Sequence, residues 1–295
     1  MTAANSSLPA AGPPRASLWR SALYKLRRDR AGLFGLAVVL VYLLAAVGAW
    51  SGWWASDWAL ITGTKWGPVS AQHWFGTNII GQDIFQRAIY STGTAFQVGL
   101  VVALLAVTLG ALLGAAGGFF AATWIDEVVL WLMGVLDAMP FYLMVAAIAF
   151  AMADNPYAMH VAMVSTFWTT TGRLVRGEVI KLRELEFVEA ARAIGVPPAT
   201  IIFRHILPNT FHILLVQLTL CFVDAIKAEV VLSFLGLGVK DGMSWGLMIS
   251  ESTLEFLAGH FNNLIVASAL LFGLVFAFNM LADSLQDALD PKQVA

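Results

Sequence analysis

The sequence is 295 residues long, with 59% hydrophobic residues, 12% charged residues and a formal net charge of −2. Soluble domains carry about 25% charged residues, so a chain with a mean hydropathy of +0.76 lacks the polar groups to cover a water-facing surface. This composition argues against a soluble enzyme, a disordered chain and a nucleic-acid-binding protein, and it favours a polytopic helical membrane protein.

The N-terminal segment divides into two parts. Residues 1–14 are rich in Ser, Ala, Pro and Gly and are predicted to form a disordered tail. In residues 15–30, apolar side chains including Leu18, Trp19 and Leu23 fall on one helical face, and most basic side chains fall elsewhere. This pattern predicts an amphipathic helix on the inner leaflet. A basic flank that only fixes the topology explains the same residues equally well.

Six apolar runs are each candidates to cross a bilayer as a helix, which needs about 20 residues. They are residues 31–53, 95–123, 128–152, 160–175, 210–239 and 264–282. The fourth run is short, rich in Thr and carries Arg173 near its end. Because the runs are continuous rather than alternating, they favour helices over strands. The sequence therefore predicts an all-α integral membrane protein with six transmembrane helices in one domain, residues 31–293.

Positive charges cluster in two places, which predicts the orientation. Of the 17 Lys and Arg residues, six precede the first run and six lie in or beside the loop after the fourth run. An even number of spans separates these clusters, so both are placed in the cytoplasm by the positive-inside rule. Both termini are then expected on the cytoplasmic side.

The first outer loop, predicted as residues 54–94, is longer than most connections. Its run HWFGTNIIGQD combines glycines with polar turn residues, which indicates ordered turns. We expect this run to form a docking surface for an external partner. A solvated connection with Trp58, Trp66 and Trp74 at the membrane interface is the alternative. The residues expected to dock are Phe75, Gly76, Thr77, Gly81 and Asp83.

The inner loop, predicted as residues 172–209, contains an amphipathic helix over residues 182–195. Phe187, Ala190, Ala191 and Ile194 recur at helical spacing, and Gly195 before two prolines fits a helix C-cap. A second short helix is expected over residues 199–207. The apolar stripe must pack against something, either the inner ends of its own helices or another subunit.

Four charged residues lie inside the predicted spans, where a charge costs ~2.5–3.5 kcal/mol and faces protein or water. Asp224 and Lys227 lie roughly 60° apart around a helix and are predicted to pair, whereas Glu229 is not. Asp137 precedes Pro140, which is expected to kink the third span. These residues either line a translocation path and meet a peptide's termini or a cationic solute, or they hold helices and subunits together.

Glycines recur in the second predicted span at a spacing that permits close helix packing. They are Gly110, Gly114, Gly117 and Gly118. The close contact is expected either within this chain or with a partner subunit.

Several motifs resemble a known family when they are taken in order. Glu189-Ala190-Ala191, followed by Gly195 and then by Leu207-Pro208, is similar to the EAA loop of ABC-importer permeases. The family pattern has Ile where this chain has His205. FGT…GQD, RHILPN, LSFLGLG, SWG and DALDPK resemble the oligopeptide/dipeptide/nickel subfamily, whose members often have Arg at the position of Gln82. The resemblance covers about residues 16–293 and is to the second, six-span permease.

This resemblance implies the permease of a type I importer in a bacterial inner membrane. Its expected partners are a second homologous permease, two ATP-binding subunits and a periplasmic or lipid-anchored binding protein, surrounded by membrane lipid. The implied substrate is a peptide, with nickel complexes, opines or other small solutes as alternatives. The residues implied to form the ATPase-coupling helix are Leu185, Glu186, Phe187, Glu189, Ala190, Ala191, Arg192 and Gly195.

No catalytic or cofactor motif accompanies these features. The sequence has no phosphate-binding loop and a single cysteine, Cys221, so we expect no enzyme activity, no metal site and no cofactor, with ATP and Mg²⁺ held by the partner subunits. A self-contained secondary transporter, driven by an ion gradient through Asp137 or Glu229, is the main alternative, although no internal repeat is evident. A purely structural membrane subunit is a third interpretation.

Overall fold

The computed structural model describes residues 24–289, so the predicted tail, most of the predicted helix 15–30 and the last residues of the DALDPK motif lie outside the described residues. Within residues 24–289 the chain is helical, and the only β-type pairings are two isolated bridges, Ile61 with Gln82 and Thr77 with Asp83. The helices are α2 (Arg30–Trp50), α3 (Ile84–Phe119), α4 (Trp124–Asp137), α5 (Phe141–Ala151), α6 (Ala158–Leu182), α7 (Glu186–Ala193), α8 (Pro198–Thr200), α9 (Phe211–Phe234), α10 (Trp245–Leu257) and α11 (Asn262–Leu289).

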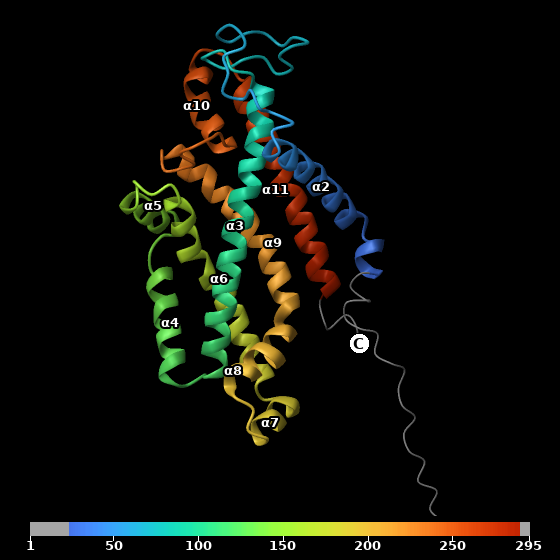
Figure 1. The fold of residues 1–295 in the computed structure, drawn as a ribbon, viewed down its shortest axis with the longest axis vertical. Coiled ribbons are helices and arrows are strands. Elements are labelled where there is room, and N and C mark those ends of the chain that lie inside the picture. The colour runs from blue at the N-terminus through green and yellow to red at the C-terminus, as the bar shows by residue number, and fades with distance from the viewer. Residues whose placement is uncertain (1–23, 290–295) are drawn as a thin grey trace, which may run out of the picture.

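The long helices form an elongated bundle with two distinct ends (Figure 1). One end carries the loop between α2 and α3 together with α10, and the opposite end carries α7. The start of α2 and the end of α11 both lie toward the end that carries α7. Asp29 begins α2 by accepting a hydrogen bond from the Ala31 amide at 3.0 Å. α2 then packs closely on α11, where Gly35 lies against the carbonyl of Ala277.

The helix α3 has 36 residues, about 54 Å at 1.5 Å per residue, and is therefore longer than a bilayer core. It begins at Ile84 because the Asp83 side chain accepts a hydrogen bond from the Gln86 amide at 2.9 Å, as an N-cap does. The predicted outer loop 54–94 was therefore too long, since residues 84–94 belong to α3. Polar side chains such as Arg87 and Thr92 hid this part of the helix from a hydropathy argument.

The helices α3 and α6 run parallel and touch backbone to backbone through glycines. At three glycines of α3, an added Cβ would clash with a backbone carbonyl oxygen of α6. The distances would be 2.6 Å from Gly110 to Trp168, 2.4 Å from Gly114 to Gly172 and 2.7 Å from Gly118 to Arg176. Both series advance four residues at a time, so one face of each helix is in contact over two turns. The glycine contact is therefore made within this chain.

The third predicted span is broken rather than continuous. α4 and α5 meet at an angle of 94° across residues 138–140, so the predicted kink at Pro140 is confirmed, and it is sharp enough to separate two helices. Proline supplies no amide hydrogen for helical bonding, and it stands as the N-cap residue of α5. α5 lies across the bundle at the level where α4 ends (Figure 1).

The inner loop is shorter than predicted, because α6 continues to Leu182 and residues 172–182 are helical. The predicted helix 182–195 is accordingly confined to α7. The predicted short helix 199–207 does not stop before Pro208. A π-helical turn, Ile201–Ile206, and a 3₁₀ turn, Leu207–Thr210, carry α8 directly into α9. This change in hydrogen-bond spacing accommodates Pro208, which has no amide hydrogen to donate.

Four helical stretches of the described chain are long and apolar enough to cross a membrane, and the bent pair α4 and α5 would make a fifth. The four are Arg30–Trp50, Ile84–Phe119, Pro198–Phe234 and Asn262–Leu289. α6 is long, with 25 residues, but its Thr, Arg and Lys side chains lower its hydropathy. The chain is therefore a multi-helix membrane protein on the grounds of length and composition.

The glycine contact predicts a difference between two Gly→Ala substitutions in helices. Gly114→Ala forces a methyl group into the Gly172 carbonyl and should lower the free energy of unfolding by about 1–3 kcal/mol. Gly177→Ala, in α6, meets nothing within 4 Å and should stabilise the helix by up to about 1 kcal/mol. Thermal unfolding in detergent, followed by tryptophan fluorescence, compares the two. Equal midpoints would contradict the close α3–α6 contact.

Candidate functional site

A pocket of about 450 Å³ opens between the α4–α5 break, α6 and α9. Its wall combines aromatic side chains with polar and charged ones. The lining residues are Leu136, Asp137, Met139, Phe141, Tyr142, Met144, Thr166, Phe167, Thr169, Thr170, Asp224 and Lys227. Three of the predicted path residues, Asp137 of α4 and Asp224 and Lys227 of α9, are thus brought to one cavity from two separate stretches of sequence. Pro140 stands at the helix break beside it.

Asp224 and Lys227 form the predicted ion pair, with the carboxylate oxygen 2.8 Å from Nζ. Their side chains are 57% and 49% exposed, respectively, in the isolated chain. Both lie within an apolar helix of membrane-spanning length. Because charges at membrane depth face water or protein rather than lipid, this side of α9 must border a hydrated path or another subunit.

Asp137 ends α4 and has two partners on α6. Thr169 donates a hydrogen bond to its carboxylate at 3.2 Å, and Arg173 forms an ion pair with it. Arg173 was not among the predicted site residues. Its position as the one basic residue within the fourth predicted span was the signal that could have identified it.

Glu229 does not line this pocket, unlike the other predicted path residues. It is 4% exposed, and its carboxylate accepts a hydrogen bond from Ser233, one turn further along α9. Ser233 in turn lies 3.4 Å from Ser244, the residue that caps α10. As predicted, Glu229 does not join the Asp224–Lys227 pair. It ties α9 to the start of α10.

The helix α7 is attached to the bundle by one narrow face. Val188 and Ala191 are buried and pack with Phe119, Val179 and other residues at the inner ends of α3 and α6. The Arg192 guanidinium lies 4.7 Å from the centre of the Phe119 ring, at a distance typical of a cation–π contact. Gly195 has a φ of +79°, so the predicted C-cap is confirmed.

The opposite face of α7 is apolar but uncovered in this chain. Leu185 is 45% exposed, Phe187 42% and Ile194 81%. Of the predicted stripe, Ala191 faces the bundle, whereas Phe187, Ala190 and Ile194 are exposed in this chain. Residue spacing could not reveal this, since α7 has two apolar faces and Val188 belongs to the second. Glu186, Glu189 and Arg192 are also exposed.

The predicted docking residues of the outer loop mostly build the loop itself. Gly76, Thr77, Gly81 and Asp83 are buried, and only Phe75 is exposed, at 39%. Both glycines have positive φ values, of +76° and +87°. The Thr77 hydroxyl donates to the Thr64 carbonyl at 2.6 Å and accepts from the Gly67 amide at 2.7 Å. The surface of the loop is formed instead by other side chains, namely Trp53, Leu60, Ile61, Val69, Trp74 and Ile80.

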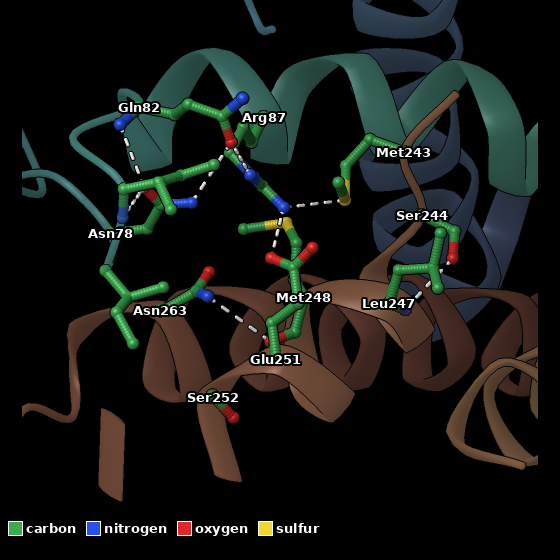
Figure 2. A network of polar contacts seen from close by, with 12 residues as sticks. Asn78, Gln82, Arg87, Met243, Ser244, Leu247, Met248, Glu251, Ser252 and Asn263 are labelled. Atoms are coloured by element: carbon green, nitrogen blue, oxygen red, sulfur yellow. Dashed lines mark hydrogen bonds and ion pairs between the residues drawn. The ribbon is translucent and has the colours of Figure 1, made fainter. Parts of the chain in front are cut away.

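Below this loop lies a buried polar network that the sequence argument missed (Figure 2). Its centre is Arg87 of α3, which is 1% exposed. The guanidinium donates to Gln82 of the loop, to the Met243 sulfur at 3.1 Å and to Glu251 of α10. Glu255, also buried, accepts a hydrogen bond from the Ile79 amide at 2.7 Å. One cation therefore joins the outer loop, α3 and α10.

Gln82 has a defined role in this network. Its carbonyl oxygen accepts from both Arg87 and Asn78, and its amide nitrogen donates to the Ala59 carbonyl at 2.9 Å. The uncharged Gln82 side chain thus accepts a hydrogen bond from Arg87. An arginine at position 82 would instead repel the Arg87 guanidinium. The pKa of Glu251 is raised above its ordinary value, mainly because the carboxyl group is buried. The Arg87 charge partly opposes this increase, and the Glu255 charge adds to it.

Among the described residues, no group of three or more His, Cys, Asp or Glu side chains lies close enough to hold a metal ion. The charged pocket and the exposed side chains of α7 each offer chemistry to other molecules. The first offers paired charges and hydroxyl groups, and the second offers an apolar contact surface flanked by charges.

The sequence of this chain is similar to one family of known proteins. The family described as binding-protein-dependent transport system inner membrane component matches residues 106–294. A dipeptide transport system permease protein of Alkalihalophilus pseudofirmus is 35% identical over 287 residues, covering 94% of this chain and 90% of the relative. The dipeptide and oligopeptide transport system permease proteins of Bacillus subtilis are each 33% identical, covering 95% and 94% of this chain and 87% and 90% of their own lengths, respectively.

The Arg87 network predicts an unequal effect of its two charged members. Arg87→Gln leaves Glu255 buried without the cation and should lower the free energy of unfolding by about 3–5 kcal/mol. Glu251→Gln should cost much less, because the Glu251 side chain is 40% exposed. Limited proteolysis of the outer loop and the thermal midpoint in detergent measure both. Equal loss in the two variants would contradict the central role of Arg87.

Proposed function

The chain belongs to the family of binding-protein-dependent transport system inner membrane components and is a permease component of an ABC importer, and from this premise we propose that it forms half of a translocation pathway for peptides. The three relatives are named as transporters of dipeptides or oligopeptides. Nickel complexes and other small solutes remain alternatives within the subfamily that the motifs resemble.

The observation that carries this proposal is the charged pocket beside α9. Asp137, Asp224 and Lys227 reach it from α4 and α9, and hydroxyl groups of α6 complete its wall. A half-exposed ion pair within a membrane-spanning helix needs water or a second subunit beside it. A pathway formed between this chain and a homologous permease supplies both the water and the second subunit. The pocket then contributes polar groups to one side of that pathway.

We propose six membrane crossings, with α4 and α5 together as the third and α6 as the fourth. The parallel packing of α3 on α6 supports this count, because the chain must return once between two parallel helices. α9 and α11 supply the last two crossings, and residues 31–293 form the permease domain. The termini and α7 are assigned to the cytoplasmic side, in line with the positive charges before α2 and around α7.

The proposed complex contains this chain, a second homologous permease, two ATP-binding subunits that hold ATP and Mg²⁺, and a periplasmic or lipid-anchored binding protein. No nucleic acid is involved, and the complex resides in a bacterial inner membrane. α7 is the proposed coupling helix, because its exposed Leu185, Phe187 and Ile194 offer an apolar surface to an ATP-binding subunit. Glu186, Glu189 and Arg192 flank that surface, and Gly195 ends the helix with a sharp turn.

In this mechanism the chain transmits force and does not hydrolyse ATP. ATP binding favours one conformation of the partner ATPases over the other, and only this difference in affinity can do work on the pathway. Movement of α7 reaches the bundle through Val188 and Ala191, which pack on the inner ends of α3 and α6. The pathway then alternates between openings toward the two sides of the membrane.

The coupling role predicts that two exposed residues of α7 control assembly. Phe187→Ser combined with Ile194→Ser removes apolar contact area without opening the core, so the Kd for the ATP-binding subunit should rise about tenfold, which equals ~1.4 kcal/mol. Co-purification from host membranes and titration in detergent measure this change. Leu257→Ser, 78% exposed at the opposite end of the molecule, is the matched control and should not affect binding.

The path role predicts how the Asp224–Lys227 pair responds to double mutation. Lys227→Gln alone should slow solute transport in proteoliposomes by about fivefold, which is ~1 kcal/mol, because a lone carboxylate remains in the pathway. The double variant Asp224→Asn with Lys227→Gln should stay slow if the charges meet the solute. Restoration of the wild-type rate in the double variant would show that the pair only stabilises α9.

A further inference from the structure

The helix α4 is held to the bundle by few contacts. Its buried residues are Asp126, Val129 and Met133, whereas Trp124 and Trp131 are 72% and 65% exposed. Met133 rests directly on α6, because a Cβ added to Gly172 would lie 2.5 Å from its methyl group. This single line of contacts leaves the two ends of α4 to be positioned by other interactions.

Two arginines of α6 supply those interactions, one at each end of α4. Arg176 pairs with Asp126 in the first turn of α4 through two hydrogen bonds, of 2.6 and 2.8 Å. Arg173 pairs with Asp137 at the last residue of α4. The two arginines lie about one helical turn apart and directly follow Gly172, the residue on which Met133 rests. α4 is thus clasped at both ends from one short stretch of α6.

The two ion pairs differ in how much free energy is needed to open them. The Asp126 and Arg176 side chains are 5% and 23% exposed, and Asp126 also accepts a hydrogen bond from the Ala122 amide at 3.1 Å. The Asp137 and Arg173 side chains are 42% and 54% exposed. Separating a buried bidentate pair leaves uncompensated charge, whereas an exposed pair exchanges its partner for water at little cost. The Asp137 end therefore opens far more easily.

The chain next to Asp137 is also arranged for movement. α4 ends there, residues 138–140 form the 94° break, and a Cβ added to Gly134 would meet nothing within 4 Å. Leu136, Asp137 and Met139 line the charged pocket. Any swing of this end of α4 about its Asp126 end would change the width of the pocket directly.

We propose that Arg173 is a positioning residue that keeps the pocket narrow by holding Asp137, and that α4 swings outward by pivoting on the Asp126–Arg176 pair. This inference rests on the proposed function, because it treats the pocket as part of the pathway. A charged group that competes for Asp137 or Arg173, whether from a passing solute or from the second permease, releases the pair.

The pivot is also connected to α7. Arg183, at the C-terminal end of α6, donates to the Phe119 carbonyl at 3.2 Å, and Arg192 of α7 lies over the Phe119 ring. Phe119 ends α3, and α4, with Asp126 in its first turn, begins only a few residues later. Displacement of α7 therefore acts on the fixed end of α4, while the releasable end borders the pocket.

Cysteine labelling tests this proposal in the intact complex without measuring transport. In a Cys221→Ala background, which has no native thiol, Thr170→Cys places one thiol in the pocket wall. The rate of reaction with a small water-soluble maleimide is measured in native membrane vesicles. Arg173→Gln should raise this rate about fivefold, the ratio for an exposed ion pair worth ~1 kcal/mol, without changing the thermal midpoint. Arg173→Lys should keep the labelling slow.

The matched comparison is Arg176→Gln, which should lower the thermal midpoint of the purified complex because it breaks the buried pair. The exchanged pair Asp137→Arg with Arg173→Asp should restore slow labelling. Three results would each overturn the proposal. They are labelling of Arg173→Gln at the wild-type rate, equal effects of Arg173→Gln and Arg176→Gln on both readouts, and no rescue by the exchanged pair. Labelling as expected without any ATP-dependent transport would instead contradict the proposed function and leave the closing role of Arg173 intact.

Discussion

The close approach of α3 and α6 is the constraint on which the rest of the molecule depends. Gly110, Gly114 and Gly118 leave no room for a side chain against the α6 backbone, so the two helices pack as one rigid pair in a solvent where hydrophobicity alone does not drive helix association. Each functional feature is then placed relative to this pair. Met133 of α4 rests on Gly172 of the same contact, and α7 packs on the inner ends of both helices.

Charge is distributed around this pair in two distinct ways. Arg87 and Asp126 are buried and bind partners on elements that are distant in sequence, and Glu229 is buried with Ser233 of its own helix. Asp137, Asp224 and Lys227 are about half-exposed and share one pocket. Since an ionised group at membrane depth must have partners or water, burial separates the charges that hold the fold from those that face the pathway. Four charges inside apolar runs look alike in the sequence, and only the packing distinguishes Glu229 from the other three.

Hydropathy, glycine spacing and Pro140 were sufficient to predict the long apolar helices, the close helix contact and the break in the third span, but not α10 or the start of α3. The Asp224–Lys227 pair followed from helical geometry alone, since both residues lie on one element. The remaining features depend on contacts between residues that are distant in the sequence. Arg87 lies inside α3 because Gln82 and Glu251 satisfy it, and Val188 rather than Phe187 faces the bundle because of where α3 and α6 end. The docking glycines likewise serve the backbone of their own loop.

The account depends most on α7 as the contact to an ATP-binding subunit, and site-specific photo-crosslinking in host membranes measures this contact directly. A photoreactive amino acid at position 194 replaces Ile194, which is 81% exposed, and a second variant carries it at position 257 at the opposite end. The account predicts a covalent product between position 194 and an ATP-binding protein, and no such product from position 257. The account would be contradicted if position 194 crosslinked only to lipid or to further copies of this chain and the purified chain alone carried out ion-driven transport.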